Sequence, residues 1–143
     1  MRPFVYALFC ATALSGAALS TPTLAQTLTI GVRGGPESID PHFTATGTHA
    51  EALKHVFDTL TWSGDKLQIE PRLALSWKTL EPTVWEFKLR PGVKFHDGSD
   101  FTADDVIATY TRILDEDTAA AARTNYISIE SMEAPDPYTV IFH

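Results

Sequence analysis

The sequence predicts an α/β fold in which a mixed sheet is flanked by helices, and two neighbouring patterns carry this prediction. Apolar and polar residues alternate from Val84 to Arg90, as in a half-buried strand. One face of this strand carries Trp85, Phe87 and Leu89. The segment after Thr102 instead has apolar residues at the spacing of one helical face. These residues are Val106, Ile107, Tyr110, Ile113 and Leu114.

The first 25 residues have the pattern of a secretory signal peptide. Arg2 is followed by an uncharged apolar run that begins at Phe4, and Thr23-Leu24-Ala25 offers small residues to a signal peptidase. We expect cleavage after Ala25 and a mature segment over residues 26–143. A membrane anchor is the rival interpretation, but the apolar run is shorter than the roughly 20 residues that a spanning helix needs.

Charge and cysteine content exclude two classes of protein. The chain of 143 residues has a formal net charge of −7, so it offers no basic surface for the phosphates of nucleic acid. Its single cysteine, Cys10, lies inside the apolar run, so the mature segment cannot form a disulfide. An exported, acidic, cysteine-free domain fits the bacterial periplasm.

The first half of the mature segment predicts a strand and then a helix. Residues 28–32 alternate in the manner of a strand, and Gly34-Gly35 ends it. Apolar residues at helical spacing predict a helix from Ala50 to Leu60, with Thr48 as its N-cap.

Turn and capping residues frame the central strand and helix. Pro91-Gly92 and Asp97-Gly98 predict turns on either side of a short extended segment. Thr102 and Asp105 have the spacing of a capping box, with Asp in place of Glu, and the helix should end near Asp115.

The C-terminal residues predict a β-hairpin. Its strands are expected at 127–133 and 138–143, joined by Ala134-Pro135-Asp136-Pro137. The chain ends within the second of these strands, which predicts an exposed apolar edge and a truncated sequence.

The chain carries no motif for catalysis or for metal binding. His42, His49, His55 and His96 lack H-x3-H or H-E-x-x-H spacing, and Gly34-Gly35 lacks the lysine of a phosphate-binding loop. Turn and cap chemistry accounts for the acidic residues near His96, and no nucleophile motif is present. Trp85 is expected in the core, whereas Trp62 and Trp77 remain candidates for stacking on a ligand.

A resemblance to a known family rests on one long stretch. Residues 73–113 read LALSWKTLEPTVWEFKLRPGVKFHDGSDFTADDVIATYTRI, and Ile39-Asp40-Pro41-His42 and Phe57-x-x-Leu60 extend the match towards the N-terminus. In order and spacing this resembles the extracellular solute-binding proteins of family 5, which serve peptide, nickel and opine importers. The signature itself is expected to be structural.

The resemblance implies a fold of the periplasmic binding protein type II class, with two lobes around a hinge. Residues 26–143 are then the N-terminal part of the first lobe, together with the small extra subdomain that such proteins carry, here between Trp62 and the hairpin. Such proteins close on a ligand and deliver it to a membrane permease. The expected partners are a peptide or related small solute and permease subunits, with no nucleic acid, no cofactor and a monomeric full-length protein.

The resemblance also suggests where a ligand is contacted. One segment follows Asp40-Pro41-His42, and the other follows the capped helix. The expected residues are Thr46, Gly47, Thr48, His49, Asn125 and Tyr126. Loops at the ends of elements commonly carry binding groups, and backbone amides beside Gly47 can meet an extended peptide.

Three other functions stay open. The same scaffold can bind nickel, haem, an opine or a sugar, because specificity belongs to the cleft and not to the scaffold. A secreted hydrolase would need catalytic residues outside this sequence. The sensor domain of a signalling receptor would need a membrane span further along the chain.

Overall fold

The computed structural model describes residues 27–32, 34–35, 38–43 and 47–143. The chain divides into two units, Met1–Gly31 and Val32–His143. The predicted signal peptide lies outside the described residues. The strand predicted at residues 28–32 is wrong, because these residues are extended without strand pairing and Leu28 is 82% exposed. An alternating pattern becomes a strand only where a neighbouring strand pairs with its backbone, and no described strand does so here.

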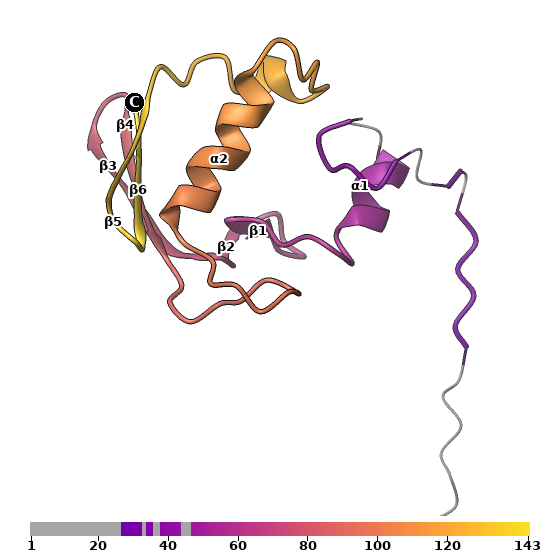
Figure 1. Ribbon diagram of the computed structural model, residues 1–143. Coiled ribbons are helices and arrows are strands. Elements are labelled where there is room, and N and C mark those ends of the chain that lie inside the picture. The colour runs from indigo at the N-terminus through magenta and orange to yellow at the C-terminus, as the bar shows by residue number, and fades with distance from the viewer. Residues whose placement is uncertain (1–26, 33, 36–37, 44–46) are drawn as a thin grey trace, which may run out of the picture. The chain divides into compact units, whose positions relative to one another are not determined.

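A four-stranded antiparallel sheet is the main element of the second unit (Figure 1). Its strands lie in the order β3 (Ala74–Glu81), β4 (Val84–Leu89), β6 (Thr139–Phe142) and β5 (Met132–Asp136). The predicted strand at residues 84–90 is therefore confirmed. Cross-strand partners show which residues share a face: Trp85 stands opposite Phe142, and Phe87 opposite Val140.

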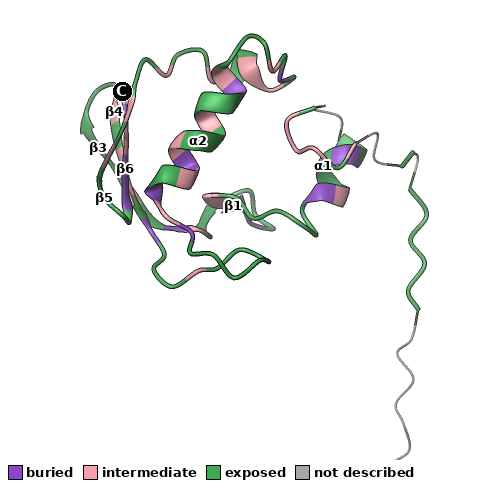
Figure 2. Cartoon of the chain, in the orientation of Figure 1, coloured by how far each residue is buried: buried purple, intermediate pink, exposed green. Residues whose placement is uncertain are grey.

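Helix α2 (Ala103–Leu114) covers one face of this sheet, and the core lies between them (Figure 2). Val106 and Ile113 of the helix are buried, as the apolar stripe predicts. Burying such side chains contributes about 1.5–3 kcal/mol each. The buried cluster consists of Ala74, Leu89, Phe101, Ala103, Val106, Val140 and Phe142.

The predicted ends of α2 are confirmed. Thr102 is the N-cap, and its backbone N–H donates to Oδ2 of Asp105 over 2.8 Å, which completes the capping box. Asp115 is the C-cap. The turns before the helix are also confirmed: Gly92 and Gly98 have φ of 73° and 90°, values that glycine adopts without the strain of a Cβ.

The predicted C-terminal hairpin exists, but its strands and turn differ from the prediction. β5 begins only at Met132 and continues through Pro135 to Asp136, and the chain reverses over residues 137–138. Proline is compatible with this strand because β5 is an edge of the sheet. The carboxylate of Asp136 closes the turn by accepting the N–H of Tyr138 and the hydroxyl of Thr139, over 2.8 and 2.7 Å.

The expectation of an exposed apolar edge at the C-terminus is wrong. β6 is not an edge strand, because it pairs with β4 on one side and with β5 on the other. Its Val140 is fully buried and its Phe142 is 8% exposed. A hairpin strand can insert beside an earlier strand, which the local sequence pattern does not reveal.

Among the described residues before the sheet, the chain forms one short helix and a two-stranded ribbon. The predicted helix at 50–60 is misplaced: α1 spans Gly47–Leu53, and Thr48 lies within it rather than capping it. Val56 and Phe57 are 57% and 42% exposed, so no packed apolar face extends the helix. β1 (Thr61–Ser63) pairs with β2 (Ile69–Pro71), and η1 (Arg123–Asn125) is a single 3₁₀ turn after α2.

Candidate functional site

The two predicted ligand-contacting segments lie on either side of helix α2 in the sequence. Gly47, Thr48 and His49 form the first turn of α1, whereas Thr46 lies outside the described residues. Asn125 ends η1 and Tyr126 follows it. The structure shows that both segments are attached to α2.

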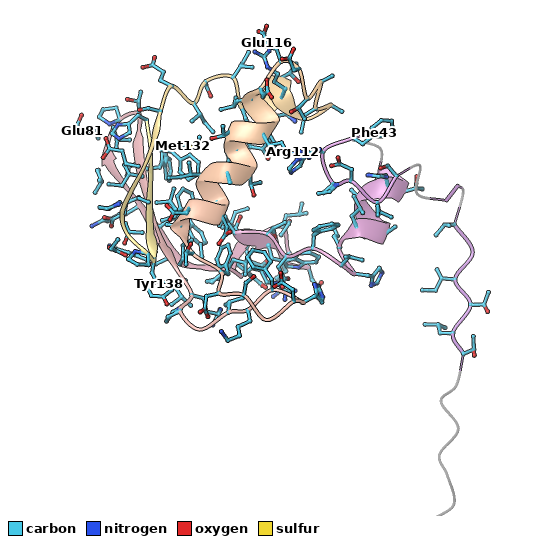
Figure 3. The ribbon with its side chains drawn as sticks, in the orientation of Figure 1. Phe43, Glu81, Arg112, Glu116, Met132 and Tyr138 are labelled. Carbon is cyan, nitrogen blue, oxygen red and sulfur yellow. The ribbon has the colours of Figure 1, made fainter. Side chains whose placement is uncertain are left out.

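Arg112, on the last turn of α2, attaches the loop at residues 38–43 (Figure 3). Its Nη2 donates to Oδ2 of Asp40 over 2.6 Å, and its Nη1 donates to Oδ1 over 3.1 Å. This two-point contact between a planar guanidinium and a carboxylate fixes direction as well as distance. The hydrogen bonds from Arg112 lower the pKa of Asp40 to about 2.

His42 is a third group in this cluster. Its Nδ1 lies 2.7 Å from Nη1 of Arg112 and accepts a hydrogen bond, because a guanidinium can only donate. The neutral ring therefore carries its proton on Nε2. Partial burial, and secondarily the charge of Arg112, lower the pKa of His42 below its ordinary value. The carbonyl of His42 accepts the N–H of Ala121 over 3.0 Å, which joins the loop to the chain that follows α2.

His49 connects α1 to the same loop. Its ring is 1% exposed, and its Nε2 lies 3.2 Å from the carbonyl oxygen of Asp40, which can only accept. Nε2 therefore carries the proton, and the buried Nδ1 has no hydrogen-bond partner among the described residues. The His49 side chain thus holds the segment together and leaves almost none of its own surface for another molecule.

The second segment is attached to α2 by aromatic packing. The rings of Tyr126 and Tyr110 meet edge to face with centroids 5.1 Å apart, and Tyr110 packs in the same way on Phe142 at 5.0 Å. Burial raises the pKa of Tyr110 to about 12, so its hydroxyl stays protonated at any physiological pH. Asn125 is exposed, which leaves its amide accessible to solvent or to a ligand.

The three tryptophans have different surroundings. Trp62 already has two cationic partners, Lys54 at 5.1 Å and the guanidinium of Arg72 at 4.8 Å from its ring centroid. Trp77 stacks on Phe87 at 6.4 Å. The expectation that Trp85 belongs to the core is wrong, because it is 42% exposed. Trp85 lies on the same face of the sheet as Phe142, but Trp85 is exposed whereas Phe142 is buried.

An open depression of about 390 Å³ lies away from these segments, and its wall includes Arg72 and Arg90. It contains none of the predicted ligand-contacting residues. In the part of the chain that the structure describes, no group of three or more His, Cys, Asp or Glu side chains could hold a metal ion. None of the described helices is long and apolar enough to cross a membrane.

The cluster of Asp40, His42 and Arg112 could not be found from the sequence. Arg112 reads simply as a basic residue near the end of a helix, where it favours the helix dipole. Its partner lies 72 residues earlier, and nothing in a single sequence pairs the two. The only available signal was the match of Asp40-Pro41-His42 to a known motif.

Comparison with known proteins identifies the family. Residues 68–143 match the model of the bacterial extracellular solute-binding proteins, family 5, in its middle region. The chain belongs to this family. The matched residues include the whole four-stranded sheet and α2, so the resemblance seen in the sequence is confirmed.

Individual family 5 proteins are similar in sequence and in fold. The oligopeptide-binding protein AppA of Bacillus subtilis is 31% identical over 116 residues, which are 80% of this chain and 21% of AppA. The structure of AppA in complex with a nonapeptide has a TM-score of 0.72 and covers 76% of this chain and 22% of the AppA chain.

Two further family 5 structures hold other ligands. AgaA of A. tumefaciens R10, in complex with agropinic acid, is 35% identical with a TM-score of 0.67, covering 76% of this chain and 22% of AgaA. NikZ of Campylobacter jejuni, in complex with Ni(L-His), is 28% identical with a TM-score of 0.72, covering 78% of this chain and 22% of NikZ.

These similarities confirm the predicted fold class. The antiparallel sheet and the helix α2 that covers it are part of the type II periplasmic binding protein fold, and the family is one of binding proteins. The chain spans about a fifth of the length of the relatives it matches.

Proposed function

We propose that this protein is the substrate-binding component of an ABC importer that captures peptides between two lobes and passes them to permease subunits. The observation that carries this proposal is the family match over residues 68–143, which includes the body of sheet and helix shared with peptide-bound AppA. In this proposal residues 1–25 direct export to the periplasm. The protein binds and releases its ligand unchanged, without catalysis.

The proposed contacts are the two segments attached to α2. An added Cβ at Gly47 would meet no described atom within 4 Å, so a side chain can be introduced there without a local clash. Thr48 and Asn125 are exposed, and Tyr126 presents the part of its ring that Tyr110 does not cover. Thr46 and His49 complete the proposed set, with His49 acting through the backbone it holds.

An opine is the second candidate ligand. It is supported by AgaA, which binds agropinic acid and is 35% identical, slightly above the 31% of AppA. NikZ adds nickel held by histidine to the ligands that this scaffold accommodates. Because fold does not determine the ligand, these classes must be separated by experiment.

The deciding experiment is thermal unfolding of the complete natural protein with di- to nonapeptides, agropinic acid, nickel with L-histidine, and haem. A ligand that binds only the folded state raises the midpoint, and a concentration of 100 times Kd stabilises by about 2.7 kcal/mol. We expect a rise with peptides and none with the others. A rise with agropinic acid alone would replace peptides by opines, and peptide cleavage during the assay would contradict a pure binding role.

A further inference from the structure

We propose that Arg112 is a positioning residue for ligand binding, which holds α1 in place through Asp40 without itself touching the ligand. The contacts around Arg112 form a chain that runs from α2 through the loop at residues 38–43 to α1. This inference rests on the proposed function, in which Gly47 and Thr48 contact the ligand. Arg112 would determine where these two residues lie.

The first step is that α2 is a fixed support. Val106 is 4% exposed and belongs to the buried cluster shared with the sheet, and Ile113, which follows Arg112, is 5% exposed, so apolar burial holds the helix in place. The capping box at Thr102 fixes its first turn. A side chain that projects from the last turn of such a helix can hold a loop in one position.

The second step is that Arg112 holds the loop at more than one point. Its guanidinium bonds both oxygens of Asp40 and the ring nitrogen of His42. The same carboxylate accepts the backbone N–H of His42 over 2.9 Å, so the loop is also closed on itself. A lysine ammonium is a point charge and cannot reproduce this planar arrangement of donors.

The third step is that Asp40 connects Arg112 to α1. The buried ring of His49 donates to the carbonyl of Asp40, the residue whose side chain Arg112 holds. Asp40 is therefore bound to α2 through its side chain and to α1 through its backbone. A displacement of Asp40 moves the helix that begins with Gly47.

Apolar packing does little to replace these polar contacts in the loop. Ile39 and Phe43, its large apolar side chains, are 86% and 61% exposed. Exposed apolar residues contribute little to fixing a segment, because they remove little surface from water. The hydrogen bonds of Arg112 are thus the main restraint that the described residues place on this loop from α2.

The test compares three variants of the complete natural protein with the unmodified one. Arg112→Met removes the guanidinium but keeps an unbranched side chain. Arg112→Lys keeps the positive charge but not the planar arrangement of donors. Lys94→Met is the matched control, because it removes a cation from an exposed ion pair with Asp100 in a different loop. Amide hydrogen exchange reports the anchoring of α1, and calorimetric titrations with trialanine and with agropinic acid report affinity.

For Arg112→Met we expect amides of residues 47–53 to exchange about tenfold faster and the affinity of the bound probe to fall about tenfold, while amides of residues 103–110 keep their rates. Arg112→Lys should give exchange rates and an affinity between those of Arg112→Met and the unmodified protein. Lys94→Met should give the same exchange rates and affinity as the unmodified protein. Unchanged exchange in residues 47–53 would overturn the anchoring. Faster exchange with unchanged affinity would overturn the positioning role. Failure of the unmodified protein to bind either probe would count against the proposed function, and the exchange comparison would still decide the anchoring.

Discussion

Two regions of this molecule are held in place by different forces. The body, formed by the four-stranded sheet and α2, has a buried apolar cluster that includes Val140 and Phe142. The described part of the segment at residues 38–53, which is 38–43 and 47–53, has few buried side chains, and its link to α2 consists of hydrogen bonds to Asp40 and His42. Apolar burial involves no charge that salt can screen or pH can titrate, whereas exposed ion pairs are weakened by both.

The difference indicates how a binding protein combines stability with adjustment. A packed core has few alternative arrangements, because its side chains interlock at high density. A loop held by a small number of polar contacts can change position at low cost, and such regions open more readily than the core. The proposed ligand-contacting residues of α1 are attached in this second way, so they can respond to a ligand while the body remains unchanged.

The largest effect is expected from removing the buried ring of Phe142 in the body. This ring is 8% exposed and meets Phe87 and Tyr110 edge to face at 5.5 and 5.0 Å. Phe142→Ala should lower the free energy of unfolding by about 3–5 kcal/mol, through lost burial and a cavity. Chemical denaturation of the complete natural protein measures this loss.

Phe95→Ala is the control for this prediction. Phe95 is 44% exposed, and within the described part of the chain its one aromatic partner is Phe101, at 6.0 Å. Replacing Phe95 by alanine should therefore lower the free energy of unfolding by only about 1 kcal/mol. If both variants lost the same free energy of unfolding, burial would not explain the stability of the body.

A smaller effect is expected at the start of α2. Asp105→Ala removes the carboxylate that accepts the N–H of Thr102, and should cost about 1 kcal/mol. Asp104→Ala is the matched control, because Asp104 lies in the same turn and is exposed. Its loss affects only the interaction with the helix dipole, about 0.3 kcal/mol. Identical denaturation midpoints for the two variants would contradict the capping box.

The sequence was sufficient to predict the elements whose determinants are local. The alternation at Val84–Leu89 and the cap and stripe of α2 each involve residues within one element, and both predictions are confirmed. The hairpin was predicted with wrong bounds, because the closing contact of Asp136 with Thr139 lets the strand continue through Pro135. The helix at 50–60 failed because its apolar spacing meets no packed surface after Leu53.

The candidate site shows the limit of such predictions more clearly. Residue types near Gly47 and Tyr126 could be proposed from a family resemblance, but their attachment could not. Arg112 and Asp40 meet only because the chain between them folds into a sheet and a helix that bring them together. The ring of His49 likewise bonds to the carbonyl of Asp40, which lies outside its own helix.

The smallest expected effect is a loosening of the segment at residues 38–53 in acid, and its sign follows from two pKa values. Hydrogen bonds from Arg112 lower the pKa of Asp40 from 3.8 to about 2, so this carboxylate stabilises the folded state above pH 3.8 and loses that effect as pH falls towards 2. Burial, then the charge of Arg112, lowers the pKa of His42 below 6.5, so its neutral ring contributes fully above pH 6.5 and less as pH falls below it. Both groups therefore weaken the segment on acidification.

Hydrogen exchange between neutral pH and pH about 3, corrected for the intrinsic exchange rates, can measure this loosening. Protection of residues 47–53 should fall in two stages, below pH 6.5 and again below pH 3.8, because His42 and then Asp40 bind protons more strongly in the opened segment than in the folded one. Protection of residues 139–142 should not follow these stages, since Val140 and Phe142 are held by apolar burial. In Arg112→Met, α1 is already released, so its protection should lose most of this pH dependence. A parallel fall in both regions would mean that the segment and the body open as one unit, and the distinction between them would have to be abandoned.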